Sequence, residues 1–129
     1  MTFQLTEPIL VIGLGGVGTR LAEKTKKSLN SDCLMISHDQ NDITAENSIK
    51  ISTKSVVNPS THLIRGSTLE TSDEIKKNIA NYSTVILMSN LAGKAGAGIG
   101  PIVSRICKQE QKNLLSFAIM PFKFEKERI

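Results

Sequence analysis

The sequence predicts an α/β fold: a Rossmann-like, doubly wound, mainly parallel sheet with helices on both faces. Short apolar runs alternate with helical patterns along the chain, which is typical of parallel sheets joined by right-handed crossovers. Glycine-rich segments follow two of the predicted strands, at the sheet edge where ligands of such folds bind.

Five strands are predicted from the hydrophobic pattern. Four are continuous apolar runs with branched side chains, the pattern of strands buried on both faces, and one polar alternating run indicates a short edge strand. The predicted strands cover residues 9–12, 33–36, 48–52, 84–88 and 114–120.

Helices are predicted at residues 17–29, 72–81 and 101–112. The second carries Asp73 and Glu74 in its first turn, where the helix dipole favours acids. The third has Pro101 at an early position, where the missing N–H costs nothing. Residues 40–69 show little periodicity apart from the edge strand, and Asn58-Pro59-Ser60 predicts a turn there. A segment of that length with so little structure is often functional or mobile.

Composition and charge narrow the class of protein. The 129 residues suit a single domain, and 40% hydrophobic with 22% charged residues is ordinary for a soluble globular protein. Aromatic residues make up only 4%, with no Trp, which argues against base stacking on single-stranded nucleic acid. The net charge of +4 is spread along the chain, mostly on predicted solvated faces such as that of Arg20, so no nucleic-acid patch is expected.

The two cysteines, Cys33 and Cys107, lie far apart in apolar stretches and lack the spacing of a zinc site. We expect them to be buried thiols of a reducing compartment, which favours a cytoplasmic location. The N-terminus has no signal-peptide pattern, and no apolar run approaches the ~18 residues of a membrane span.

The first glycine-rich segment, GLGGVG at 13–18, has the G-x-G-x-x-G spacing between a strand and a helix. Without Cβ atoms its backbone N–H groups can approach phosphate oxygens, and the helix N-terminus adds partial positive charge. Asp39 follows the second strand, where a dinucleotide fold places the acid that holds the ribose, so NAD is one interpretation. The alternative is a tight turn required only by helix packing.

The second segment, AGKAGAGIG at 92–100, also lies between a strand and a helix, and it is not a Walker motif because no Gly-Lys-Ser/Thr occurs. Its amides are suited to an anion nest, and Lys94 either adds a charge to the phosphate or points into solvent. Two such loops on neighbouring strands predict a phosphate chain that is held from two sides.

Four segments, in order, resemble the N-terminal GTP-binding domain of the FtsZ/tubulin superfamily: VIGLGGVGT, ISHD, LMSNLAGKAGAGIGPIVSRI and IMPFKFEKER. The resemblance implies GTP or GDP as the ligand, with both glycine segments near the phosphates, Asp39 near the γ-phosphate and magnesium, and Glu125 on the ribose. The nucleotide-binding residues that it implies are Gly15, Gly16, Val17, Asp39, Gly93, Lys94, Gly96, Ala97, Gly98, Glu125 and Arg128.

The chain departs from the family pattern at several positions, which is typical of a divergent member. Ala92 and Lys94 replace glycines of the tubulin signature GGGTG-T/S-G, and Ala95 replaces its first threonine. Ser37-His38-Asp39 stands where the family often has Asn-Thr-Asp, and only Arg65-Gly66-Ser67 is available for a third phosphate loop.

The resemblance also implies a cytoskeletal or cell-division role with self-association or a filament partner. In the family, hydrolysis depends on an acidic loop that a second domain supplies in trans, so residues 1–129 are expected to form one nucleotide-binding domain that is a GTPase only with that loop. Two other readings stay open: a Rossmann-type module that binds NAD or ATP, and an FtsZ-like interaction domain without hydrolysis.

Overall fold

The structure, a computed structural model, describes residues 6–29, 31–39, 47–53, 59–90 and 93–119. Within them, five strands form one parallel sheet in the order β3-β2-β1-β4-β5. The strands are β1 (Ile9–Leu14), β2 (Asp32–Ser37), β3 (Ser48–Lys50), β4 (Thr84–Asn90) and β5 (Asn113–Ile119). The helices are α1 (Gly15–Leu29), α2 (Thr61–Glu70), α3 (Ser72–Ile79) and α4 (Lys94–Gln109).

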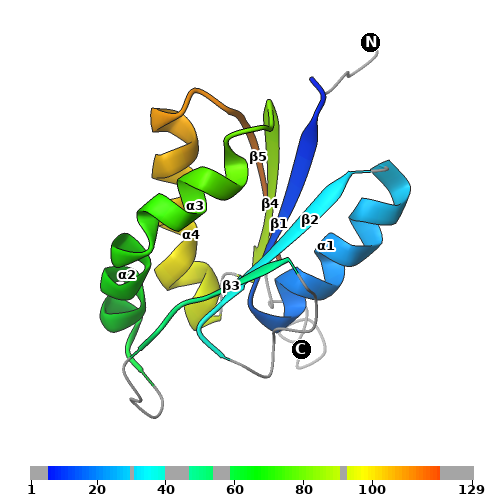
Figure 1. The fold of residues 1–129 in the computed structure, drawn as a ribbon. Helices are drawn as coiled ribbons and strands as arrows, with labels where there is room; N and C mark the ends of the chain where they lie inside the picture. Colours follow the sequence, from blue (N-terminus) through cyan, green and yellow to red (C-terminus); the bar gives the residue numbers. More distant parts are fainter. Residues whose placement is uncertain (1–5, 30, 40–46, 54–58, 91–92, 120–129) are drawn as a thin grey trace, which may run out of the picture.

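Helices lie on both sides of this sheet (Figure 1). The helix α1 covers one face, while α2, α3 and α4 lie on the other. The predicted doubly wound fold is therefore confirmed, and every strand pairing in the described sheet is parallel. The short strand β3 lies at one edge, as its polar alternation predicted.

The central strand β1 divides its side chains between two cores. Leu10, Ile12 and Leu14 belong to the larger core on the α4 side, whereas Ile9 and Val11 belong to a smaller one on the α1 side. This alternation is the period of two that a strand imposes, and all six residues of β1 are buried, as the continuous apolar run predicted.

The helix α4 begins earlier than predicted, at Lys94 instead of Pro101, so most of the second glycine-rich segment is helical and not a loop. Pro101 lies inside the helix and has no N–H to offer the carbonyl of Ala97 one turn earlier. The guanidinium of Arg65 donates to that carbonyl from α2 at 3.4 Å, which replaces the missing helical hydrogen bond.

The helix α2 was not predicted, because its segment is polar and weakly periodic. Ser60, which the sequence placed in a turn, is its N-cap, and the Ser60 hydroxyl accepts a hydrogen bond from the Leu63 amide at 3.1 Å. Its buried face includes Thr68, whose hydroxyl donates to the Ile64 carbonyl at 2.7 Å. Residues 65–67, the candidate third phosphate loop, are therefore part of a helix.

Candidate functional site

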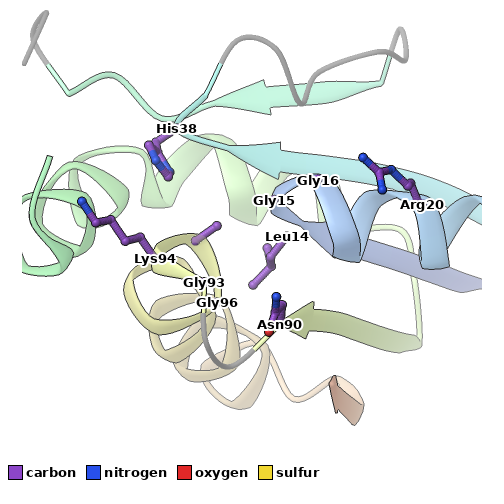
Figure 2. Close-up of a pocket in the computed structure, with 10 residues that line it drawn as sticks. Leu14, Gly15, Gly16, Arg20, His38, Asn90, Gly93, Lys94 and Gly96 are labelled. Carbon is purple, nitrogen blue, oxygen red and sulfur yellow. The ribbon is translucent and has the colours of Figure 1, made fainter. Parts of the chain in front are cut away.

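A cleft of about 250 Å³ lies at the carboxyl edge of the sheet, between the N-termini of α1 and α4 (Figure 2). It forms there because β1 and β4 are adjacent parallel strands, so the helices that follow them begin side by side. The described residues that line it are Leu14, Gly15, Gly16, Arg20, His38, Asn90, Gly93, Lys94, Ala95 and Gly96. Both predicted glycine segments therefore meet at one site.

The first glycine segment turns sharply into α1. Gly15 has a φ of +71°, in the left-handed region that L side chains rarely adopt, and a Cβ there would lie 3.1 Å from the Ala95 Cβ on α4. Gly16 lines the cleft, and Val17 follows in the first turn of α1, although its side chain lies outside the described part. A residue larger than glycine at 15 would be strained and would push the two helix ends apart.

The second segment leaves the N-terminus of α4 without a cap from a side chain. Gly93 is the N-cap in an extended conformation, with φ −86° and ψ 149°, and it makes no side-chain hydrogen bond. The other helices of that layer differ, because Ser60 caps α2 and Asp73 and Glu74 lie in the first turn of α3. First-turn amides of α4 face a cleft with no acid in either bordering first turn, which is the environment that binds anions.

The remaining residues of the second segment divide between the cleft and helix packing. Gly96 lines the cleft, and a Cβ there would lie 2.4 Å from the Asn90 carbonyl oxygen. Gly98 instead faces α2, where a Cβ would lie 2.8 Å from Ile64 Cγ2. Ala97 and Gly98 are not among the described residues that line the cleft, and their contact with phosphate remains a prediction.

Lys94 does not simply point into solvent, and its contact with phosphate remains a prediction. Its ammonium donates to the Pro59 carbonyl at 2.8 Å, which ties the start of α4 to the segment that precedes α2. Its stem lines the cleft and the residue is half-buried. Arg20, which was assigned to a solvated face, is exposed but also lines the cleft, so one border is basic.

The predicted metal and ribose residues remain predictions. Asp39 is exposed just past β2 and is not among the described lining residues, and its amide donates to the Ser37 hydroxyl at 3.1 Å. Among the described residues, no group of three or more His, Cys, Asp or Glu side chains is arranged to hold a metal. Glu125 and Arg128 lie outside the described residues.

Two lining residues, His38 and Asn90, were not predicted as ligands. Each lies at the carboxyl end of a strand, and that position is the signal that would have found them, because ligands of parallel sheets bind there. Nδ1 of His38 is buried and has no hydrogen-bond partner in the described structure. An unpartnered buried polar atom beside a cleft indicates a place for a ligand atom.

Groups with raised pKa values lie elsewhere. The hydroxyl of Tyr82 donates to Asp32 at 2.6 Å, and this bond, with some burial, raises the pKa of Tyr82 to about 12. Burial raises the pKa of the Cys107 thiol to about 11. Cys33 and Cys107 are not joined in a disulfide in the described structure; Cys107 is buried as predicted, whereas Cys33 is only half-buried.

The chain resembles a known protein family in sequence and solved structures in fold. Residues 8–129 match the model of the Tubulin/FtsZ family, GTPase domain. The chain belongs to this family. No curated protein matches the sequence. No helix in the described ranges is long and apolar enough to cross a membrane.

Solved structures of the Tubulin/FtsZ family share the fold. An FtsZ dimer from M. jannaschii aligns with a TM-score of 0.77 at 23% identity, over 94% of this chain and 38% of that one. TubZ of Clostridium botulinum phage c-st aligns at 0.70 and 17% identity, over 88% and 41%. A protofilament of TubZ from bacteriophage PhiKZ aligns at 0.62 and 20% identity, over 85% and 37%. The chain thus spans about two fifths of these structures.

Proposed function

We propose that this chain is the guanine-nucleotide-binding domain of an FtsZ/tubulin-like cytoskeletal or cell-division protein. The observation that carries the proposal is the cleft shared by two glycine-bordered helix N-termini, at the carboxyl edge of adjacent parallel strands. Uncapped amides and helix dipoles at such a place favour phosphate. Membership of a GTPase-domain family supports guanine as the base.

The size of the cleft suits part of a nucleotide. Small-molecule sites commonly measure ~300–1,000 Å³, and this cleft measures about 250 Å³. We therefore assign it to the phosphate chain, with Gly15, Gly16 and Val17 on one side and Gly93, Lys94 and Gly96 on the other. The ribose would be held by Glu125 with Arg128 beside it.

A magnesium ion fits this proposal through Asp39. Mg²⁺ commonly takes one or two protein carboxylates together with phosphate oxygens and water, so one exposed carboxylate past β2 is a sufficient protein contribution. The ion would neutralise charge on the phosphate chain when bound. Asp39 would hold it from the end of β2, beside the cleft residue His38.

The filament part of the proposal rests on the relatives. Their structures are described as an FtsZ dimer and a TubZ protofilament. We propose that the chain self-associates in the same manner as part of a cytoplasmic filament. Hydrolysis by the chain alone is expected to be undetectable, because the acidic loop would come from a second domain in trans.

Calorimetry with GTP, GDP, ATP and NAD tests the nucleotide. We expect GTP and GDP to bind and ATP and NAD to bind at least tenfold more weakly. Gly93→Val should weaken GTP at least tenfold, because its extended backbone accepts a β-branched residue and the new side chain enters the cleft. A Cβ at 93 makes only ordinary contact, 3.4 Å from the Asn90 carbonyl oxygen.

Gly66→Val is the matched control, since Gly66 is exposed, does not line the cleft, and a Cβ there has no neighbour within 4 Å. It should bind GTP as the unmodified chain does. Tight NAD binding without GTP binding would make the chain a dinucleotide module. Binding of no nucleotide at all would favour an interaction domain that kept only the fold.

A further inference from the structure

His38 is a cleft residue that neither the glycine motifs nor the signature accounts for. Its side chain is half-buried, and its Nδ1 is buried without a hydrogen-bond partner in the described part of the chain. A buried nitrogen left unpaired is destabilising, so it requires an explanation. A hydrogen bond between a ligand atom and Nδ1 is one such explanation, because His38 lines the cleft.

The backbone on both sides of His38 is fixed. The Ser37 carbonyl accepts a hydrogen bond from the Ile51 amide at 2.8 Å, and the Ser37 hydroxyl accepts one from the Asp39 amide at 3.1 Å. Ser37 itself is buried at the end of β2. The backbone that carries the imidazole is therefore held beside the cleft by the end of β2.

Lys94, the cation on the same side of the cleft as His38, already has a hydrogen-bond partner. In Figure 2 the His38 ring and the Lys94 stem lie on one side of the cleft, and Arg20 lies on the opposite side. The Lys94 ammonium already donates to the Pro59 carbonyl at 2.8 Å. His38 lines the cleft, and its Nδ1 has no such bond within the described residues, so its capacity for a hydrogen bond is unused there.

We propose that His38 is a ligand-binding residue of the cleft whose Nδ1–H donates a hydrogen bond to an oxygen of the bound phosphate chain. The inference rests on the proposed function for the identity of the nucleotide, but the bond itself requires only a phosphate oxygen. It is the tautomer with the proton on Nδ1 that binds, and the phosphate supplies the acceptor that the folded chain lacks.

Two nearly isosteric variants isolate this bond. In His38→Asn the amide nitrogen stands at the place of Nδ1, whereas His38→Leu has the same branched shape without a donor. The Leu variant should bind GTP roughly 10- to 150-fold more weakly, the loss expected for one hydrogen bond to a charged group. The Asn variant should bind within about threefold of the unmodified chain, and His38→Gln, with its nitrogen at the Nε2 position, should not recover.

The other histidine of the chain is the matched control. His62 is exposed on α2 and does not line the cleft, so His62→Leu should leave GTP affinity unchanged. Far-UV circular dichroism and thermal melts establish that each variant is folded. Should the His38 variants fail to fold, ¹⁵N spectra of the two imidazoles in the unmodified chain serve instead: tripolyphosphate should shift His38 Nδ1 and leave His62 unmoved.

The same titrations separate the two proposals. If GTP binds and His38→Leu binds it equally well, or if His38 Nδ1 does not respond to ligand, the role of His38 is overturned and the nucleotide proposal stands. If guanine nucleotides do not bind but tripolyphosphate binds in a His38-dependent manner, the nucleotide is overturned and the role of His38 stands. Binding of neither overturns both, and recovery by Gln instead of Asn overturns the assignment to Nδ1.

Discussion

The two helices that border the cleft start from similar sequences but pack in different surroundings. Among the described helices only α1 covers its face of the sheet, over a core of four buried residues, whereas α4 lies over the larger core with α2 and α3 beside it (Figure 1). Gly15 and Gly16 at the first helix provide a left-handed turn and a wall of the cleft. The glycines of α4 mostly allow close packing of this helix against its neighbours.

The difference shows that glycines are clustered beside this cleft for more than one structural reason. Gly93 and Gly96 border the cleft, but Gly96 also lies against the Asn90 carbonyl and Gly98 lies against α2. Substitution at each position should therefore affect different properties. Those at packing positions should lower the free energy of unfolding, and those at the cleft should lower ligand affinity.

Gly18→Ala should have the largest effect on stability. A Cβ at 18 would lie 2.4 Å from the Met88 carbonyl oxygen, and backbone cannot move aside as a flexible side chain can. We expect a loss of about 3 kcal/mol in the free energy of unfolding, the upper end of overpacking costs, measured by urea denaturation. Stability equal to that of the unmodified chain would mean that α1 does not approach β4 this closely.

Gly98→Ala should cost less, about 1–2 kcal/mol, because the nearest atom is a side-chain carbon. The new Cβ would meet Ile64 Cγ2 at 2.8 Å, and leucine at 64 has no methyl at that position. The double variant Gly98→Ala with Ile64→Leu should therefore recover part of the loss in a double-mutant cycle. Strict additivity would contradict the described contact between α2 and α4.

Most of the fold could be predicted from the sequence, since the buried strands and α3 carry strong apolar patterns. The start of α4 could not, because glycine and proline lower helix propensity and only tertiary contacts overcome it. Arg65, which donates to the carbonyl that Pro101 leaves free, is such a contact and lies 32 positions away. The helix α2 was missed because its buried face includes hydroxyls, Ser67 and Thr68, instead of a continuous apolar stripe.

The site could also be predicted only in part. Motif spacing located Gly15, Gly16, Gly93, Lys94 and Gly96 at the cleft, because those residues follow adjacent strands directly. It also included Gly98, whose direction is set by the turn of a helix that the sequence placed later. His38 and Asn90 lie inside segments that resemble the family, but the resemblance implied no ligand role for either, and only their three-dimensional placement shows that they line the cleft.

The two cysteines lie on opposite faces of the sheet and differ in burial. Cys107 is buried in the larger core, and burial raises its pKa from 9.0 to about 11; Cys33 is half-buried on the α1 side. A raised folded-state pKa contributes stability that is complete below pH 9 and is lost as the pH rises through 11. Between pH 8 and pH 10 the loss should be roughly 1 kcal/mol.

Urea denaturation at the two pH values measures this loss, and Cys107→Val should reduce the pH dependence because it removes the thiol. At pH 8 an alkylating reagent should modify Cys33 readily and Cys107 only after unfolding. Equal modification rates for both thiols in the folded chain would contradict the greater protection of the α4 face.

Gly66→Ala should have the smallest effect and the opposite sign. Gly66 is exposed in α2, and a Cβ there would have no neighbour within 4 Å, so the change removes only the entropic cost of glycine in a helix. We expect a gain of about 0.5–1 kcal/mol and a rise of a few degrees in Tm. Because the same Gly→Ala change should destabilise at 18 and 98, a loss of stability at 66 would mean that the glycines of this chain cannot be sorted by their described contacts.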